Sequence, residues 1–483
     1  MVPAAVEGWD MGPRSDPERT FAMRGISGWA LRVAWETWRA ERGGPEAFNR
    51  LQQARLSALV EFARSASPYY RRLYRDLPDT VNEPAQLPPV GKRDLMANFD
   101  DWVTDPHITL AKLKSELLSD LSRLGSLYRG QYLVVTTSGT SGEPAVLIHD
   151  RFSWVMVNVV VRIRERRNLV RASEVRDFLF RGLRAAALVA SGGHFAGVVL
   201  TENARRRAPA IARRLRVFSV LRPLSELVAE LNTFKPTLLF GYPSAVIQLA
   251  AEQKAGRLRI RPVLVICSGE NLSASGQAAI EAAFGCRVTQ RYLSSEVPAL
   301  TSQCRHGAFH VNTDWYILEP VDADYAPVPA GTTSHTVLVT NLANRVQPLI
   351  RYDLGDRVTL ATEPCPCGSP FPAVSIDGRT GDLVSFAAAD GSAVTVLPLA
   401  LGTVIEETPG VRRFQAIRTG PGNLTVRLEV LPGAAVALVR TAVTERLDEY
   451  FAAVGAGPVA VEHADELPRP DRSGKFRQVW SVR

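Results

Sequence analysis

The sequence predicts an α/β fold, with a large N-terminal domain of layered α/β subdomains and a small α+β C-terminal domain. Its 483 residues are enough for more than one domain. Short apolar runs bounded by turn residues, at 198–200, 238–240 and 263–267, are typical of buried parallel strands covered by helices. After residue 383, apolar alternation typical of strands and a helical period over 436–451 indicate a smaller α+β unit.

The N-terminal part is predicted to be mostly helical up to about residue 130. A break is expected at Gly43, Gly44 and Pro45, and apolar residues recur at helical spacing over 48–66. The chain then alternates between helices and strands. This order favours a layered fold over a single helical bundle.

The composition is that of an ordinary globular protein, with 46% apolar and 22% charged residues. A net charge of +8 and a pI near 9.4 suit an anionic ligand such as a nucleotide, CoA or a carrier protein. The sequence has neither the spacing of a zinc finger nor interleaved aromatic and basic residues, so we expect no nucleic-acid partner. The charge run RIRERR at 162–167 predicts a solvated helix face, and the alternative is a docking patch for an anionic tail or carrier.

Five cysteines in a chain of this length argue against a disulfide framework and for a reducing compartment. The N-terminus lacks the basic-then-apolar pattern of a signal peptide. The most apolar stretch, 185–200, is too short for a membrane span and is interrupted by Gly192, Gly193 and His194. We therefore expect a cytoplasmic protein without a membrane span.

A loop dense in hydroxyls and glycines lies between two strand-like segments. Its residues are Thr136, Thr137, Ser138, Gly139, Thr140, Ser141 and Gly142. Glycines let a backbone approach a ligand closely, and such a loop turns its N–H groups and hydroxyls toward a polyphosphate. A Walker A loop would end in Gly-Lys-Ser/Thr, whereas Gly142 is followed by Glu143 and Pro144. The alternative is an ordinary hairpin turn.

Two further polar loops follow predicted strands. Their candidate ligand-facing residues are Tyr242, Ser268, Gly269 and Glu270. In α/β folds the ligands bind outside the carboxyl ends of parallel strands, so these loops are candidate binding segments. The alternative is a plain helix cap formed by Ser244 or Ser268.

Four later phrases combine carboxylates with aromatic or basic residues. They are QRYLSSE at 290–296, IRYDLGDR at 350–357, IDGRTGD at 376–382 and RSGKFR at 472–477. A carboxylate beside a polyphosphate suits Mg²⁺, which prefers hard oxygen ligands. A carboxylate also makes charge-assisted bonds to vicinal hydroxyls. Each phrase alone equally suits an exposed turn.

Together with the hydroxyl-rich loop, these phrases resemble, in order, the motifs of the adenylate-forming enzymes: acyl-CoA synthetases, peptide-synthetase adenylation domains and luciferases. Phrases at 69–74 and 87–95 resemble the phenylacetate-CoA ligase-like and CapK-like subgroup. The resemblance covers roughly residues 60–480. It implies a large domain over 1–378 that binds ATP and an acid, and a small mobile domain over 379–483 that carries the Gly-Lys loop.

The resemblance also implies a role for each motif. The loop at 136–142 holds phosphates, with the loop at 268–270 in the same ATP/AMP site. The further assignments are Tyr292 beside the adenine, Ser295 in the ATP/AMP site, Glu296 as a catalytic residue that serves Mg²⁺, Asp356 for the ribose hydroxyls, and Arg379 for the nucleotide and hinge. Lys475 is the catalytic candidate, because a cation there stabilises the negative charge that develops on phosphorus. The alternative for Lys475 is a surface lysine.

Three residues are candidates for the acid pocket: His194, Phe195 and Tyr242. Pockets combine aromatic side chains with a few polar groups, and these residues supply both. His194 is equally a candidate for an ordinary core or loop histidine.

A structural zinc site is predicted from CRHGAFH at 304–310 and CPC at 365–367. The candidate ligands are Cys304, His310, Cys365 and Cys367. Three thiols and one histidine form closed tetrahedral zinc sites. His306 is the alternative to His310, and reduced cysteines packed in loops are the alternative to a metal. Similar Cys/His phrases occur in the phenylacetate-CoA ligase-like subgroup.

The predicted function is ATP-dependent activation of a small carboxylic acid through an acyl-adenylate, then transfer of the acyl group to CoA with release of AMP and pyrophosphate. An amine, or the thiol of a carrier protein, is the alternative acceptor. A catalytically inactive nucleotide-binding homologue is a further alternative, which the departures from the motifs at Glu143, Leu293 and Gly381 favour. A phosphotransferase is disfavoured by the missing Walker lysine.

Overall fold

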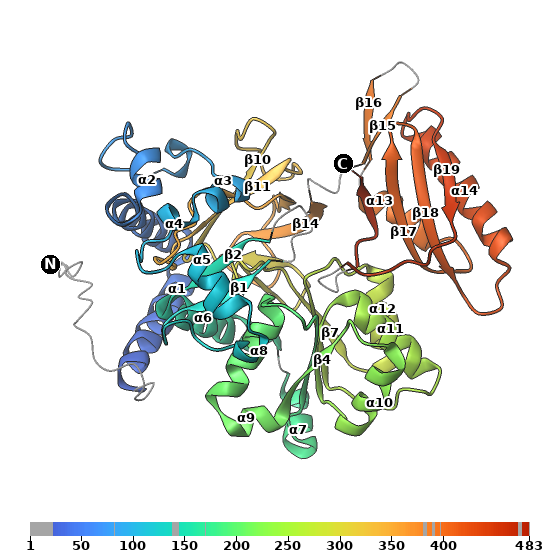
Figure 1. The fold of residues 1–483 in the computed structure, drawn as a ribbon, viewed down its shortest axis with the longest axis horizontal. Coiled ribbons are helices and arrows are strands. Elements are labelled where there is room, and N and C mark those ends of the chain that lie inside the picture. Colours follow the sequence, from blue (N-terminus) through green and yellow to red (C-terminus); the bar gives the residue numbers. More distant parts are fainter. Residues whose placement is uncertain are drawn as a thin grey trace.

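The computed structural model describes residues 23–81, 83–137, 144–169, 171–379, 384–388, 392–396, 398–471 and 476–482. Figure 1 shows a large body, which contains the N-terminal and central elements, and a smaller body beside it that begins after β14. Among the described residues, no helix combines the length and the apolar character that crossing a membrane requires.

A five-stranded parallel sheet lies at the centre of the large body, and it confirms the predicted α/β fold class. In spatial order its strands are β4 (Leu215–Ser219), β3 (Ala185–Val189), β5 (Leu238–Gly241), β6 (Leu264–Ser268) and β7 (Arg287–Arg291). All neighbours pair in parallel. The strands predicted at 238–240 and 263–267 therefore exist, and their carboxyl ends share one edge.

Helices cover both faces of this sheet, as Figure 1 shows. They are α8 (Ala196–Arg207), α9 (Pro209–Arg214), α10 (Leu224–Phe234), α11 (Pro243–Lys254) and α12 (Ala274–Phe284), and α7 (Ala172–Arg181) precedes β3. Along β3 the side chains alternate: Ala186 and Leu188 pack with residues of α10 to α12, whereas Ala187 and Val189 pack with Val198 of α8.

The strand predicted at 198–200 is wrong, because these residues lie inside α8. Val198 and Val199 are buried as predicted, but in a helix that packs on the sheet. A run of three apolar residues fits either element, and the strand that pairs with β5 is β3, which comes earlier in the chain.

Helices dominate the N-terminal part, as predicted. They are α1 (Met23–Ala66), α2 (Pro68–Leu73), η1 (Pro84–Gln86), α3 (Lys92–Ala97), α4 (Phe99–Trp102), α5 (Leu110–Leu113), η2 (Lys114–Leu118) and η3 (Leu121–Arg123). The expected break appears as a kink inside α1, where Gly44 has a φ of 69°. Such a positive φ favours glycine. Ser67 then caps α2 by accepting from the Tyr70 N–H.

Antiparallel strands join the N-terminal helices to the central sheet. The hairpin β1 (Leu133–Thr136) and β2 (Val146–His149) precedes α6 (Arg151–Leu169). One sheet has the order β13-β14-β9-β8 and another the order β10-β11-β12. Their bounds are β8 (Thr301–Gln303), β9 (Phe309–Val311), β10 (Tyr316–Val321), β11 (Thr336–Asn341), β12 (Tyr352–Asp353), β13 (Asp356–Leu360) and β14 (Ala373–Arg379).

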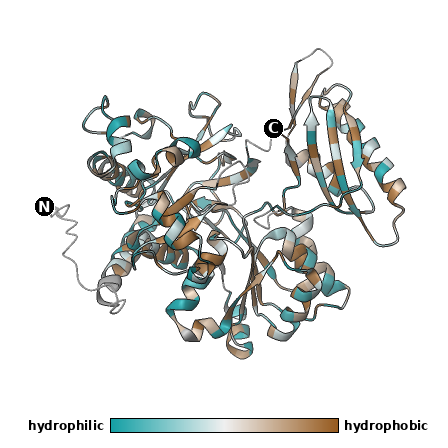
Figure 2. Cartoon of the chain, in the orientation of Figure 1, coloured by the Kyte–Doolittle hydropathy of each residue, from teal (hydrophilic) through white to brown (hydrophobic). Residues whose placement is uncertain are grey.

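The smaller body has an apolar core of its own, made of residues between 384 and 479. Its elements are β15 (Val384–Ala387), β16 (Ala393–Val396), α13 (Pro398–Glu406), β17 (Val411–Gly420), β18 (Asn423–Val430), α14 (Val436–Ala453), β19 (Ala460–Ala464) and β20 (Val479–Ser481). Burial alternates along β18, and Figure 2 shows the matching alternation of apolar and polar residues. Because this core is separate, we propose a domain boundary at the end of β14, where the sequence predicts it between residues 378 and 379.

Candidate active site

Three side chains from separate motifs meet at Asp356. The antiparallel register of β13 and β14 sets Asp356 opposite Arg379, and the Arg379 Nε lies 2.9 Å from Asp356 Oδ1. The hydroxyl of Tyr292, which follows β7, donates to Asp356 Oδ2 at 2.9 Å. Arg379 also donates to the Leu354 carbonyl at 2.9 Å. Strand pairing and the hydrogen bond from Tyr292 thus bring together three residues that the resemblance assigned to one nucleotide site.

The phenol of Tyr292 stays protonated in this arrangement. Burial, and then the negative charge of Asp356, raise the pKa of Tyr292 well above its ordinary value. The hydroxyl is therefore a fixed donor to the carboxylate. Arg379 places the opposite charge beside Asp356, and the carboxylate can accept further hydrogen bonds.

Glu296 is buried four residues after Tyr292. Its Oε1 accepts from the Tyr352 hydroxyl at 3.4 Å, and its main-chain carbonyl accepts from Asn341 Nδ2 at 3.1 Å. Burial and the nearby charge of Glu296 raise the pKa of Tyr352, so this phenol is also a donor. A buried carboxylate oriented in this way fits the predicted Mg²⁺ ligand, since magnesium takes one or two carboxylates with its phosphates.

The segment that carries Ser295 and Glu296 is tied to the hairpin of the hydroxyl-rich loop. His149, at the end of β2, places its Nε2 2.9 Å from the Ser295 carbonyl. Burial lowers the pKa of His149, so the ring is neutral and its Nε2–H donates. This contact fixes the distance between two motifs that are separated by 146 residues.

The base of the hydroxyl-rich loop is closed by hydrogen bonds. Thr137 N donates to the Ala145 carbonyl at 2.9 Å, and Ala145 N donates to the Thr137 hydroxyl at 2.8 Å. Thr136 N donates to the His194 carbonyl at 2.7 Å. The predicted phosphate residues Ser138, Gly139, Thr140, Ser141 and Gly142 lie outside the described residues, and so do Glu143 and Gly381.

The three candidates for the acid pocket lie near the carboxyl edge of the central sheet. Phe195 forms a bridge with Thr136, next to the hydroxyl-rich loop. His194 is 3% exposed, and its Nε2 has no hydrogen-bond partner among the described residues. Burial lowers the pKa of His194 and raises that of Tyr242 to about 12. Both side chains are therefore neutral polar groups in an apolar setting.

Glu270 links three segments of the chain. It follows Gly269, whose φ of 85° turns the chain sharply after β6. Its Oε2 accepts from the Ser244 N–H at 3.0 Å, and its Oε1 accepts from the Ser244 hydroxyl at 3.1 Å. The same Oε1 accepts from the Phe476 N–H at 2.7 Å. Lys475, the residue before Phe476, lies outside the described residues.

The four predicted metal ligands are gathered in one place. The ligand atoms of Cys304, His310, Cys365 and Cys367 all lie within 4.8 Å of one another. Pairing of β9 with β14 holds His310 beside the cysteine loop. The His310 Nδ1 lies 2.8 Å from the Phe371 carbonyl, and its Nε2 lies 3.3 Å from the Cys367 sulfur. An Nδ1–H that donates to a carbonyl leaves Nε2 free to bind a metal.

The side chain of His306, the alternative ligand, is not part of this cluster. Its Nε2 instead accepts from the neighbouring Arg305 at 3.1 Å. Cys267 is buried elsewhere, and burial raises its pKa to about 12. Three thiols and one imidazole at this spacing have the composition of a structural zinc site.

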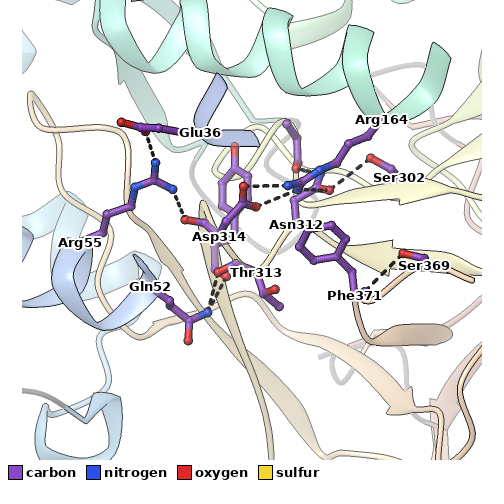
Figure 3. Close-up of polar contacts among 12 residues, drawn as sticks. Glu36, Gln52, Arg55, Arg164, Ser302, Asn312, Thr313, Asp314, Ser369 and Phe371 are labelled. Carbon is purple, nitrogen blue, oxygen red and sulfur yellow. Dashed lines mark hydrogen bonds and ion pairs between the residues drawn. The ribbon is translucent and has the colours of Figure 1, made fainter. Parts of the chain in front are cut away.

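Part of the charge run at 162–167 is buried, so the prediction of a solvated helix face is wrong there. Arg164 reaches from α6 to Asp314 with two contacts of 2.8 and 2.7 Å and to Asn312 at 2.7 Å, as Figure 3 shows. Its guanidinium also lies 4.1 Å from the ring centroid of Phe371. Glu165 is buried as well and pairs with Arg291. The contacts of Arg164 join α6 to the turn after β9, and the Glu165–Arg291 pair joins α6 to the end of β7.

Sequence reasoning missed three residues of this region. Tyr352 lies in the phrase at 350–357, but no role was predicted for it. His149 and Asn341 belong to none of the motifs. Their contacts arise from strand pairing and from loops that meet only in the folded chain. The one signal in the sequence was the position of His149, directly after the apolar run 145–148 that follows the hydroxyl-rich loop.

Comparisons with known proteins agree with the overall fold. No protein-family model matches the chain. It is 26% identical over 394 residues to phenylacetate-coenzyme A ligase of Thermus thermophilus, covering 78% of this chain and 80% of that protein. It is 25% identical over 142 residues to protein CapK of Staphylococcus aureus, covering 29% of this chain and 30% of that protein. A structure of 2-hydroxyisobutyryl-CoA ligase with R3-HIB-AMP covers 98% of this chain and 96% of that chain, with a TM-score of 0.66 and 20% identity.

The chain is thus similar to phenylacetate-CoA ligase of Thermus thermophilus over most of its length and has the fold of 2-hydroxyisobutyryl-CoA ligase. The roles of the individual residues stay predictions. A hydrogen bond connects Tyr292 to Asp356, and an ion pair connects Asp356 to Arg379. Glu296 is linked to them by the chain segment after Tyr292. It ties the small domain to Glu270 at the carboxyl edge of the sheet.

Proposed function

We propose that the protein activates a small carboxylic acid with ATP, forming an acyl-adenylate and pyrophosphate, and then transfers the acyl group to CoA with release of AMP. The observation that carries this proposal is the meeting of Tyr292, Asp356 and Arg379 through contacts of 2.9 Å. A carboxylate fixed by a phenol and a guanidinium suits the two vicinal hydroxyls of a ribose. ATP and CoA as substrates also favour a cytoplasmic site of action.

The remaining roles follow from position. Thr136 and Thr137 begin the loop that would hold the phosphates, and Glu296 would hold Mg²⁺, which supplies charge neutralisation between phosphate oxygens. Lys475 would offer its ammonium group to the acid and the α-phosphate. His194 and Tyr242, both neutral, would line the pocket for the acid.

An amine acceptor is the second candidate. The chain is 29% identical over 136 residues, 27% of its length, to indoleacetate–lysine synthetase of Pseudomonas savastanoi. It is 23% identical over 288 residues to fumarate–(S)-2,3-diaminopropanoate ligase of Enterobacter agglomerans. Both names describe amide formation, which uses the same adenylate with a different nucleophile. A carrier-protein thiol is the third acceptor to test.

We also propose that Cys304, His310, Cys365 and Cys367 hold a structural zinc ion. The support is the donor set itself, with three thiols and an imidazole within 4.8 Å. A zinc there would fasten the loop at 365–367 to the β8–β9 hairpin. We assign this zinc ion a structural role and no part in the activation of the carboxylic acid.

Acid-dependent exchange of pyrophosphate into ATP tests the first step. Asp356→Asn should lower the exchange rate about 100-fold or more, because the variant loses the charge that would bind the ribose. Asp177→Asn, in the exposed part of α7, is the matched control and should leave the rate unchanged. Folded wild-type protein that shows no exchange with a broad panel of acids would contradict the proposal, and AMP binding without exchange would favour an inactive homologue.

The acceptor is identified in the second step. The wild-type protein is incubated with the active acid, ATP and either CoA or a panel of amines, and the product mass is measured. A thioester mass with CoA alone supports the ligase proposed here. An amide mass with an amine, and none with CoA, would replace it with the amide-forming reaction.

A further inference from the structure

The N-terminal half of α1 exposes a stripe of large apolar side chains. Leu31, Trp35 and Trp38 recur at helical spacing and are 72%, 54% and 43% exposed. Figure 1 shows this half of the helix at the outer edge of the large body. Apolar side chains that are exposed singly need no explanation, whereas a contiguous stripe marks a contact surface for a protein or a membrane.

The opposite face of the same helix packs against the large body. Val33, Thr37 and Ala40 are buried, and α1 runs along α6. The ring of Trp29 meets the ring of Phe152 in α6 edge to face, with 5.9 Å between the centroids. This packing fixes the rotation of the helix about its axis, so the stripe faces outward.

Two arginines lie on the rings of the stripe. The guanidinium of Arg39 lies 5.1 Å from the ring centroid of Trp35, and that of Arg42 lies 4.6 Å from the ring centroid of Trp38. Both distances are within the range of a cation–π contact. The exposed face of α1 therefore combines apolar rings with positive charge.

A hollow beside this half of α1 extends the positive charge. It has a volume of about 210 Å³, and Ala30 of α1 lines it together with Arg151 and Arg162 of α6 and Arg207 at the end of α8. Burial and the charge of Arg151 lower the pKa of Arg207, since like charges repel each other. An anion at the hollow would relieve this repulsion.

Carboxylates near these arginines have partners within the protein. Glu36 and Glu41 are the acidic residues of α1 before the kink, and Glu36 pairs with Arg32 and Arg55. Asp150 also lines the hollow, but its two oxygens accept from main-chain N–H groups at 2.7 and 3.0 Å. The positive charge of the face and the hollow is thus only partly balanced by the protein.

This charge favours an anionic lipid surface over a second copy of the chain. A two-fold contact would press the face against itself and bring Arg39 and Arg42 toward the arginines of the other copy. Tryptophan and leucine beside arginine are typical of helices that lie in the headgroup region of a membrane. Arginines at that level are attracted to anionic headgroups.

We propose that the exposed face of α1, made of Leu31, Trp35, Trp38, Arg39 and Arg42, binds peripherally to a membrane surface that carries anionic phospholipids. The helix lies along the surface with its rings at the level of the headgroups, and the arginines of the hollow attract further phosphate groups. Neither the face nor the hollow includes a residue assigned to the nucleotide, the acid or zinc. The inference therefore stands apart from the proposed ligase activity.

Sedimentation of the full-length protein with lipid vesicles tests the proposal. The protein should bind vesicles of phosphatidylcholine mixed with phosphatidylglycerol about tenfold or more tightly than vesicles of phosphatidylcholine alone. Added salt should weaken the binding, because it screens the exposed charges. No binding to the mixed vesicles, or equal affinity for both kinds, would overturn the proposal.

The double variant Leu31→Gln and Trp35→Gln tests the apolar stripe. Its affinity for the mixed vesicles should fall about tenfold or more, because less apolar area enters the headgroup region. Leu438→Gln is the matched control, since Leu438 is 71% exposed on α14 of the smaller body, and it should bind like the wild type. An unchanged affinity in the double variant, or an equal loss in the control, would count against the stripe and overturn the proposal.

The double variant Arg39→Gln and Arg42→Gln tests the charge. It should bind the mixed vesicles about tenfold more weakly and with a smaller dependence on salt. The control replaces two exposed arginines elsewhere, Arg75→Gln and Arg176→Gln, and keeps the same net charge as the test variant. If both double variants lost affinity equally, the attraction would come from the net charge of the whole protein, and the assignment to α1 would be refuted.

Sedimentation velocity without vesicles separates lipid binding from self-association. The variant with Leu31→Gln and Trp35→Gln should have the same mass in solution as the wild type. A dimeric wild type and a monomeric variant would show that the stripe joins two copies of the chain, and the proposal would be wrong. All variants should keep the circular dichroism spectrum of the wild type, because the substituted side chains are exposed.

Discussion

Tyr292 and Asp356 stand 64 residues apart in the sequence and are joined by a hydrogen bond of 2.9 Å from the phenol to the carboxylate. Because burial and the charge of Asp356 raise the pKa of Tyr292, this donor persists over the working pH range. Tyr292→Phe removes the donor and leaves Asp356 held by Arg379. We expect the KM for ATP to rise about five- to tenfold, which corresponds to about 1 kcal/mol for one hydrogen bond.

Tyr325→Phe is the control for this prediction. Tyr325 also donates to an aspartate, at 3.2 Å to Asp353, but it lies outside the predicted nucleotide motifs. Its KM for ATP should match that of the wild type. Equal effects of the two substitutions would mean that the Tyr292 contact is only structural.

The sequence predicted features that depend on residue type or on neighbours in the chain better than features that depend on distant partners. The Cys/His cluster could be predicted because ligand chemistry belongs to residue types, and β9 and β14 then bring the two phrases together. Arg164 could not be placed, because its partner Asp314 is 150 residues further along. A run of charges looks solvated until distant acceptors are known. The run at 198–200 was misassigned because three apolar residues fit a helix and a strand equally well.

The buried pair of Arg164 and Asp314 should be important for stability. The two side chains are 4% and 0% exposed. Arg164→Met would leave the Asp314 carboxylate buried without its guanidinium partner, because Arg55 donates to the main-chain carbonyl of Asp314 instead. Breaking such a pair costs about 3–5 kcal/mol. We expect the free energy of unfolding in urea to fall by that amount, provided that the transition stays cooperative.

Arg222→Met is the matched surface control. Arg222 contacts both Glu226 and Glu230, but its side chain is 42% exposed. Exposed pairs contribute about 1 kcal/mol or less. A loss of less than about 1 kcal/mol in Arg164→Met would show that water reaches Asp314 and that the network in Figure 3 is not what joins α6 to the turn after β9.

Metal analysis of the purified protein checks the zinc prediction. We expect about one zinc per chain, with Cys365→Ser and Cys367→Ser each lowering that content and the midpoint of thermal unfolding. Cys286→Ser is the control, since Cys286 lies outside the cluster. Treatment with a chelator should lower the midpoint of the wild type but not that of Cys365→Ser. Zinc-free protein with an unchanged midpoint in all variants would rule the site out.

The buried His149 should make stability depend on pH. Burial lowers its pKa below the ordinary value of 6.5, so the unfolded chain takes up a proton at a higher pH than the folded chain does. Stability is therefore fully present above pH 6.5 and falls as the pH is lowered through and below that value. His149→Gln keeps a donor for the Ser295 carbonyl but does not titrate. Its free energy of unfolding should fall less than that of the wild type between about pH 7 and pH 5, whereas His107→Gln, at an exposed position, should follow the wild type. Identical slopes for all three proteins would mean that His149 is solvated in the folded state and does not hold the Ser295–Glu296 segment as a neutral donor.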